Sequence, residues 1–241
     1  TSEGERVIDL LWEIIAARGF ESDTYFEQAA QHIRALPKLE GTVHVNLALV
    51  LKFLPQYLMA TGDYTDVPVR QDAADDAYLF EQGPAKGLGK ITFGPWRPAL
   101  EKYAHLPNVA RFLEQVDAFT QLVMTQPPSA EQQKDLDFLL TLGQLFTQVV
   151  YAQLVCESAG QARPGTVSDM ALTDAHIDRI FAVFVQDVAE IAVALHGQAS
   201  ATDGQRTAAL GLIKAPVIEA DAEAAFVSEV LALSGAYVMP E

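Results

Sequence analysis

The chain has 241 residues and carries 32 Asp and Glu against 16 Lys and Arg, a formal net charge of −16 at pH 7. A protein this acidic is repelled by phosphate groups, which excludes nucleic acid as an expected partner. Half of the residues are hydrophobic, so the chain can bury a core, and its single cysteine excludes an internal disulfide and a multi-cysteine zinc site. We expect no metal site, no secretory leader and no transmembrane segment, and therefore a cytoplasmic protein.

Apolar residues recur at helical spacing through the first part of the chain. The first predicted helix ends near Gly19, and the second runs from Asp23, as its N-cap, to about Leu36, where Pro37 stops it. The apolar segment 43–59 predicts a third helix, which Pro55 kinks or ends.

A Gly- and Pro-rich segment, residues 62–105, predicts loops. Beyond it, Pro107 opens a helix, a Ser129–Gln132 capping box opens a long apolar helix, and Thr173 caps another. Two shorter helices follow. The uncharged stretch 138–156 contains glutamines and threonines that lipid would leave unsatisfied, so we interpret it as a helix buried in protein. Since no strand pattern of useful length appears, we predict an all-α fold, a helical bundle.

The most informative stretch is 18–46, which reads as a helix ending at a glycine, a second helix, and a Glu40-Gly41-Thr42 turn that opens a third. A glutamate in a low-polarity setting beside Gly41 is suited to act as general base for a weakly acidic proton. Gly41 lets a ligand approach the backbone, and Thr42 with the N–H groups of the following helix can bind an anion. A solvated or helix-capping glutamate explains the same residues, so both interpretations stay open.

The order and ungapped spacing of these residues resemble the end of the C-terminal helical domain of acyl-CoA dehydrogenases and acyl-CoA oxidases. That family ends its flavin-binding domain with a Gly-Tyr segment, a helix carrying Arg-Asp-Ala-Arg, and a Tyr-Glu-Gly-Thr turn. Gly19-Phe20 matches the first, Arg34 matches the last arginine of the second, and Glu40-Gly41-Thr42 matches the third. The resemblance covers about residues 5–60.

This resemblance implies an FAD-dependent acyl-CoA dehydrogenase that oxidises an acyl-CoA thioester between its α and β carbons, in fatty acid metabolism; an oxidase stays open as well. Glu40 would be the catalytic base that removes the α-proton, while the β-hydride passes to the flavin. Gly41 would contact the substrate, and Thr42 and His44 would lie against FAD.

In the same family, a Gln-x-x-Gly-Gly sequence contacts FAD from the neighbouring subunit. Here Glu13 stands at its glutamine, and Ala16 and Ala17 stand at its glycines, so the resemblance implies FAD contact by Glu13 and Ala17. The resemblance therefore also implies a homo- or hetero-oligomer. It further implies that the chain is the C-terminal portion of a longer enzyme, or one subunit of a split one, active only with the N-terminal and β domains or a partner chain.

The predicted organisation has three parts. Residues 1–61 form the end of an acyl-CoA dehydrogenase-like C-terminal helical domain. Residues 62–105 form a connecting segment, and residues 106–241 form an additional helical extension domain. The alternative is a non-catalytic helical assembly or binding module derived from that family. The apolar faces predicted at 109–123 and 177–195 suit either a private core or a partner surface.

Overall fold

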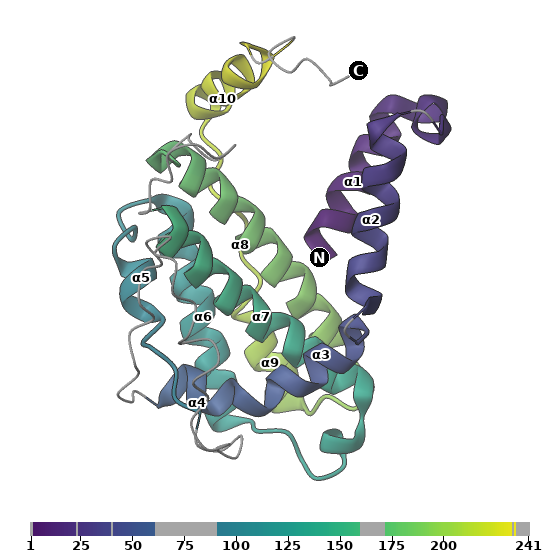
Figure 1. Cartoon of the computed structure of the whole chain (residues 1–241). Coiled ribbons are helices and arrows are strands. Elements are labelled where there is room, and N and C mark those ends of the chain that lie inside the picture. The colour runs from purple at the N-terminus through teal and green to yellow at the C-terminus, as the bar shows by residue number, and fades with distance from the viewer. Residues whose placement is uncertain are drawn as a thin grey trace, which may run out of the picture. The chain divides into compact units, whose positions relative to one another are not determined.

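The computed structural model describes residues 2–22, 24–39, 41–60, 91–159, 172–232 and 234, and in these ranges every regular element is a helix (Figure 1). The predicted all-α helical bundle is confirmed. Most of the predicted connecting segment, residues 61–90, lies outside the described residues. The chain divides into two compact units, the N-terminal unit (residues 1–52) and the C-terminal unit (residues 53–241), and each is described by itself.

The N-terminal unit consists of α1 (Ser2–Ile15), a 3₁₀ turn (Ala16–Phe20), α2 (Tyr25–Leu39) and α3 (Val43–Val50). The α-helical part of the first element ends four residues before Gly19, because Ala16 adopts a left-handed conformation with φ +50° that an α-helix cannot continue through. The 3₁₀ turn then carries the chain to Phe20.

Helix α2 covers Tyr25–Leu39 and so extends beyond its predicted end. The expected cap, Asp23, lies outside the described residues, and the Thr24 hydroxyl accepts the N–H of Glu27 at 3.4 Å. The predicted stop at Pro37 is wrong, since the helix continues through this buried proline to Leu39. The Lys38 ammonium donates to the Arg34 carbonyl at 2.6 Å, which helps to satisfy the carbonyls of a last turn that lacks the proline N–H.

The break expected at Pro55 is confirmed. Helix α3 ends at Val50, a short 3₁₀ turn follows over Leu51–Phe53, and α4 (Leu54–Met59) starts with Pro55 in its first turn. Proline is tolerated there because the first N–H groups of a helix have no partner within it.

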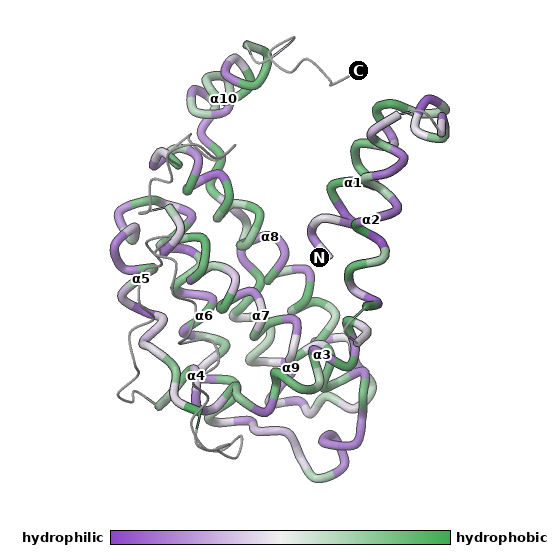
Figure 2. The backbone as a smooth tube through the Cα atoms, viewed as in Figure 1, coloured by the Kyte–Doolittle hydropathy of each residue, from purple (hydrophilic) through white to green (hydrophobic). Residues whose placement is uncertain are grey.

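The C-terminal unit is built around α8, which packs against α6, α7 and α9. After α4 it contains α5 (Arg97–Glu101), α6 (Pro107–Thr125), a 3₁₀ turn (Gln132–Lys134), α7 (Leu136–Ala159), α8 (Asp174–Gly197), α9 (Asp203–Leu210) and α10 (Ala220–Ala232). Its centre holds the rings of Phe112, Phe181 and Phe184, whose centroids lie 5.3–5.5 Å apart. Helices α7 and α8 are long and apolar enough to cross a membrane by length and composition (Figure 2). Because they bury Phe138, Phe146 and Phe181 against their neighbours, we interpret both as core helices.

Two of the three signals predicted to start helices in this unit lie where they were expected, and the third lies before a different element. Thr173 forms a capping box with His176 at the start of α8, and Pro107 opens α6, as predicted. The Ser129–Gln132 hydrogen bonds also form, at 3.0 and 3.2 Å, but they close the turn that leads into the 3₁₀ element and not the start of the long helix. Helix α7 instead starts after Asp135, whose carboxylate accepts the N–H of Phe138 at 3.2 Å.

Candidate functional site

The predicted site centres on the turn between α2 and α3. Its proposed base, Glu40, lies outside the described residues, but both of its flanks are described. Gly41 is exposed and has φ +98°, a conformation that favours glycine. A Cβ on Gly41 would approach the Asn46 amide oxygen only to 3.5 Å, an ordinary contact, so its backbone conformation and not crowding selects glycine.

Hydrogen bonds hold this turn against the start of α3. The Thr42 hydroxyl accepts the N–H of Val45 at 3.4 Å, and the Thr42 carbonyl accepts the N–H of Asn46 at 3.0 Å. The Asn46 side-chain amide donates to the Gly41 carbonyl at 3.4 Å. The segment that follows Glu40 is therefore a capped helix start whose residues face solvent.

This helix start has the chemistry of an anion-binding end. The first N–H groups of a helix have no partners inside it, and they lie at the positive end of its dipole. Thr42 takes one of them, that of Val45, which leaves the others at this end to a ligand. His44 is exposed in the same turn, so Thr42 and His44, the two residues expected against FAD, lie within one turn of each other.

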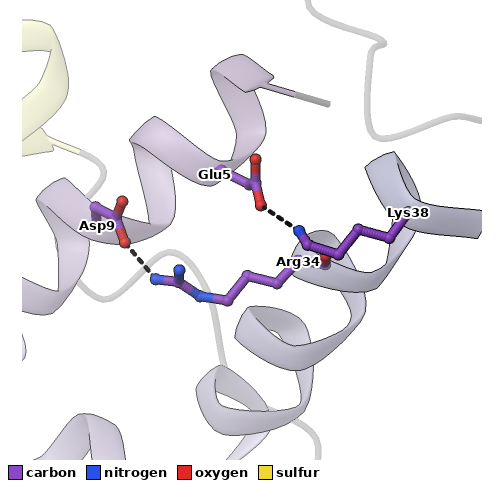
Figure 3. Close-up of polar contacts among 4 residues, drawn as sticks. All are labelled: Glu5, Asp9, Arg34 and Lys38. Carbon is purple, nitrogen blue, oxygen red and sulfur yellow. Dashed lines mark hydrogen bonds and ion pairs between the residues drawn. The ribbon is translucent and has the colours of Figure 1, made fainter. Parts of the chain in front are cut away.

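The other two predicted FAD residues lie elsewhere on the N-terminal unit. Ion pairs join the N-terminal half of α1 to the C-terminal half of α2: Glu5 to Lys38 at 3.3 Å, and Asp9 to Arg34 (Figure 3). The start of α1 thus lies beside the end of α2 that leads into the turn. Glu13 is eight residues further along α1 than Glu5, a rise of about 12 Å away from that end. Ala17 lies further still, in the 3₁₀ turn.

Glu13 borders an open hollow of about 460 Å³ on α1 and the 3₁₀ turn, lined also by Asp9, Trp12, Ala16 and Phe20. The Trp12 ring lies 4.9 Å from that of Phe20, and the Arg34 guanidinium lies 5.6 Å from the Trp12 ring centre. Arg34 neutralises Asp9, which leaves the Glu13 carboxylate as the negative charge of this hollow.

The residues matched by the resemblance have structural roles in the hairpin. Gly19 is buried against Trp12: a Cβ there would lie 2.5 Å from the indole nitrogen. Ala16 holds φ +50°, the kind of conformation in which glycine is favoured, at a position where the resembled motif has glycine. Arg34 binds α1 through Asp9 and Trp12, neither of which was a sequence candidate. Their only sequence signal is a helical three-residue spacing on the face of α1 that packs on α2.

The C-terminal unit contains a second hollow, of about 250 Å³, between the starts of α6 and α8 and one face of α10. Arg179 crosses it, paired with Glu223 and lying 5.0 Å from the Phe226 ring centre. The hydrogen bond from Arg179 holds the pKa of Glu223 below its usual value. Nearby, His176 bonds Glu229 at 3.1 Å. These contacts fasten α10 to α8. Within the described ranges, no group of three or more His, Cys, Asp or Glu side chains is arranged to hold a metal ion.

Comparison of the chain with protein-family models, with curated proteins and with solved structures gives no match. The residues of the site are therefore the basis for assigning a function.

Proposed function

We propose that the N-terminal unit is the base-bearing part of an FAD-dependent acyl-CoA dehydrogenase. The observation that carries this proposal is the turn after α2, in which Glu40 is followed by Gly41 at φ +98° and by Thr42 as the N-cap of α3. The hairpin before it supports the same proposal, because Gly19 and Arg34 have specific packing roles at the matched positions.

In the proposed reaction, the Glu40 carboxylate removes the α-proton of an acyl-CoA thioester. A thioester α-proton is weakly acidic, and a positioned carboxylate lowers the barrier to its removal. Donors that bind the thioester carbonyl stabilise the negative charge that develops there, and we assign one of them to the backbone N–H of Glu40. The open backbone at Gly41 leaves room for the thioester to approach this segment.

The start of α3 fits an FAD group, which carries a diphosphate and accepts the β-hydride when bound. Thr42 and His44 would hold it, together with the remaining N–H groups at this positive helix end. Glu13 does not fit, because its carboxylate would repel the diphosphate, and no described cation pairs with it. We therefore assign FAD contact to Thr42 and His44 and withdraw Glu13. Ala17 carries no charge and remains a candidate from a neighbouring subunit.

A complete site also needs walls that residues 1–52 do not supply. We propose that these come from the remaining part of the enzyme or from a partner subunit, within a homo- or hetero-oligomer that binds acyl-CoA. The C-terminal unit would then be a helical extension, since its buried centre is filled by the aromatic residues of α6 and α8.

The alternative function is a non-catalytic assembly module, and one observation favours it. Helix α1 exposes four apolar side chains, Val7, Leu10, Leu11 and Ile14, on one face. An exposed apolar stripe on a helix is typical of a protein–protein contact. Both functions can draw on this stripe, so the chemistry of Glu40 is what separates them.

The test is enoyl-CoA formation from saturated acyl-CoA by the assembled protein with an artificial electron acceptor. Glu40→Gln should lower the rate by at least about 10²-fold while FAD stays bound, because a general base contributes about 10²–10⁴. Glu27→Gln is the matched control, since it removes an equal charge from the same unit and should retain activity. Unchanged activity in Glu40→Gln would refute the assignment, and an assembled wild type that lacks both FAD and activity would favour the assembly module.

A further inference from the structure

One face of helix α1 packs on α2, and an apolar face on the other side of the helix does not. The packed face includes Gly4, against which Ile33 lies, and Asp9, which binds Arg34. The other face carries the stripe introduced above: Val7, Leu10, Leu11 and Ile14 are 53%, 59%, 40% and 77% exposed. A stripe of this kind at helical spacing is the surface of a helix–helix contact.

We propose that this stripe pairs with the same stripe of a second copy of the chain, antiparallel and about a two-fold axis. The four positions are symmetric about the midpoint between Leu10 and Leu11. In an antiparallel pair centred there, Val7 faces Ile14 of the partner subunit, and Leu10 faces the partner's Leu10. A two-fold contact requires a patch that is complementary to itself, and this pattern meets that requirement.

The charges beside the stripe have nearly the same symmetry, about a midpoint one residue from that of the stripe. Arg6 and Glu13 are seven residues apart, two helical turns, so they lie on the same flank of α1, next to the stripe. Antiparallel pairing brings Arg6 close to Glu13 of the partner subunit, and the reverse pair forms at the other end. Parallel pairing would instead place Arg6 beside the partner's Arg6. Arg6 also lies 3.7 Å from Glu3 of its own helix, a separation compatible with a shared contact.

The packing of α2 leaves this surface open. Glu5 and Asp9, which bind Lys38 and Arg34, lie on the side of α1 turned away from Val7 and Ile14. A second copy can therefore approach the stripe without displacing α2. This inference does not depend on the proposed dehydrogenase activity, and it gives Glu13 a role as an interface residue.

Cysteine cross-linking of the full chain tests the register. The native Cys156 is 2% exposed, so it contributes little background. In the proposed pair, two copies of residue 10 are offset by about 1.5 Å along the helix axes, whereas two copies of residue 7 are offset by about 10 Å. A disulfide requires Cα atoms about 4.4–6.8 Å apart. Under mild oxidation, Leu10→Cys should form a covalent dimer, Val7→Cys should not, and Val7→Cys mixed with Ile14→Cys should.

Charge reversal supplies an independent readout, the dimer dissociation constant from sedimentation. Arg6→Glu should weaken the dimer at least about tenfold, and the double variant Arg6→Glu with Glu13→Arg should restore it, since opposite charges again meet. Failure of all three cross-links, or self-linking of Val7→Cys as readily as Leu10→Cys, would overturn the proposal. Equal dimerisation by the single and double charge variants would overturn it too.

Discussion

The contact between Gly19 and Trp12 gives the sharpest prediction about the N-terminal unit. In Gly19→Ala, the new methyl group would lie 2.5 Å from the indole nitrogen of Trp12, 2.8 Å from its Cδ1 atom and 3.2 Å from the Cδ1 atom of Ile15. Carbon atoms pack best about 3.5–4.0 Å apart, so the methyl overlaps the indole by about 1 Å. The indole also contacts Phe20 and Phe26, at 4.9 and 5.5 Å between ring centroids, so it cannot simply swing away.

Overpacking of this kind typically costs about 1–3 kcal/mol, and we expect Gly19→Ala to lower the free energy of unfolding of the N-terminal unit by that amount. The chain has two tryptophans, Trp12 and Trp96, one in each unit. In a Trp96→Phe background, the fluorescence of Trp12 follows urea unfolding of the N-terminal unit by itself. The midpoint should fall with the slope unchanged, because the variant alters stability and not the surface exposed on unfolding.

Gly197→Ala is the matched control for this experiment. A Cβ on Gly197 meets nothing within 4 Å, so the same substitution there should leave the Trp12 transition where it is. Trp12→Phe should relieve the clash, so Gly19→Ala should lower the stability of the N-terminal unit by less in that background. Because this background lacks the Trp12 signal, stability is measured there by amide hydrogen exchange of α1. A wild-type midpoint for Gly19→Ala, or an equal loss with phenylalanine at position 12, would refute the packing described for this hairpin.

Four further outcomes are expected. Gly41→Ala should lower the free energy of unfolding of the N-terminal unit by about 1–2 kcal/mol, because alanine is strained at φ +98°. Ala16→Gly should raise it by up to about 1 kcal/mol, because glycine is favoured at φ +50°. Both changes are measured from Trp12 fluorescence during urea unfolding. Gln205→Glu should lower the free energy of unfolding of the C-terminal unit by about 1–3 kcal/mol in urea denaturation. The buried side-chain amide of Gln205 donates a hydrogen bond to Gln132, and a carboxylate cannot donate one. Burial raises the pKa of the Cys156 thiol from 9.0 to about 11, so the unfolded chain loses this proton first, and stability should fall as the pH rises between these values. Cys156→Ala should flatten that part of the pH profile.

The helix starts could be predicted from sequence where the signal is local. Thr173 and Pro107 act within one turn of their own helix, and a cap or a proline at a first turn needs no distant partner. The break before Pro55 has the same origin. The fold class follows from these signals together with the helical spacing of apolar residues.

The misplaced features depend on contacts between distant residues. The buried side-chain amide of Gln132 pairs with that of Gln205, 73 residues away. Each glutamine oxygen also accepts a backbone N–H from three residues earlier, that of Ser129 or Thr202. No local pattern predicts that pairing, and the local sequence alone favours a box at the start of the long helix that follows. Pro37 was expected to end α2, yet it is buried in the last turn.

In the candidate site, too, the local features could be predicted from the sequence and the contacts between helices could not. The Gly41 conformation and the Thr42 cap follow from residue type, and both belong to the turn that the sequence marks. Arg34 contacts Asp9 and Trp12, which lie 25 and 22 residues earlier in the chain and on another helix. Sequence spacing alone does not reveal such contacts. The negative charge of Glu13, which disfavours contact with an anionic cofactor, can be read from the sequence, and the structure adds that the nearby Arg34 pairs with Asp9.

The central claim is that this chain supplies the base of a flavin-dependent acyl-CoA dehydrogenase. The most direct measurement is the visible absorption spectrum of the protein isolated with its natural partners, recorded without oxygen before and after addition of a saturated acyl-CoA. We expect a stoichiometric flavin band that bleaches when the thioester is added. A protein without a flavin band, or a flavin band that acyl-CoA leaves unchanged, would contradict it.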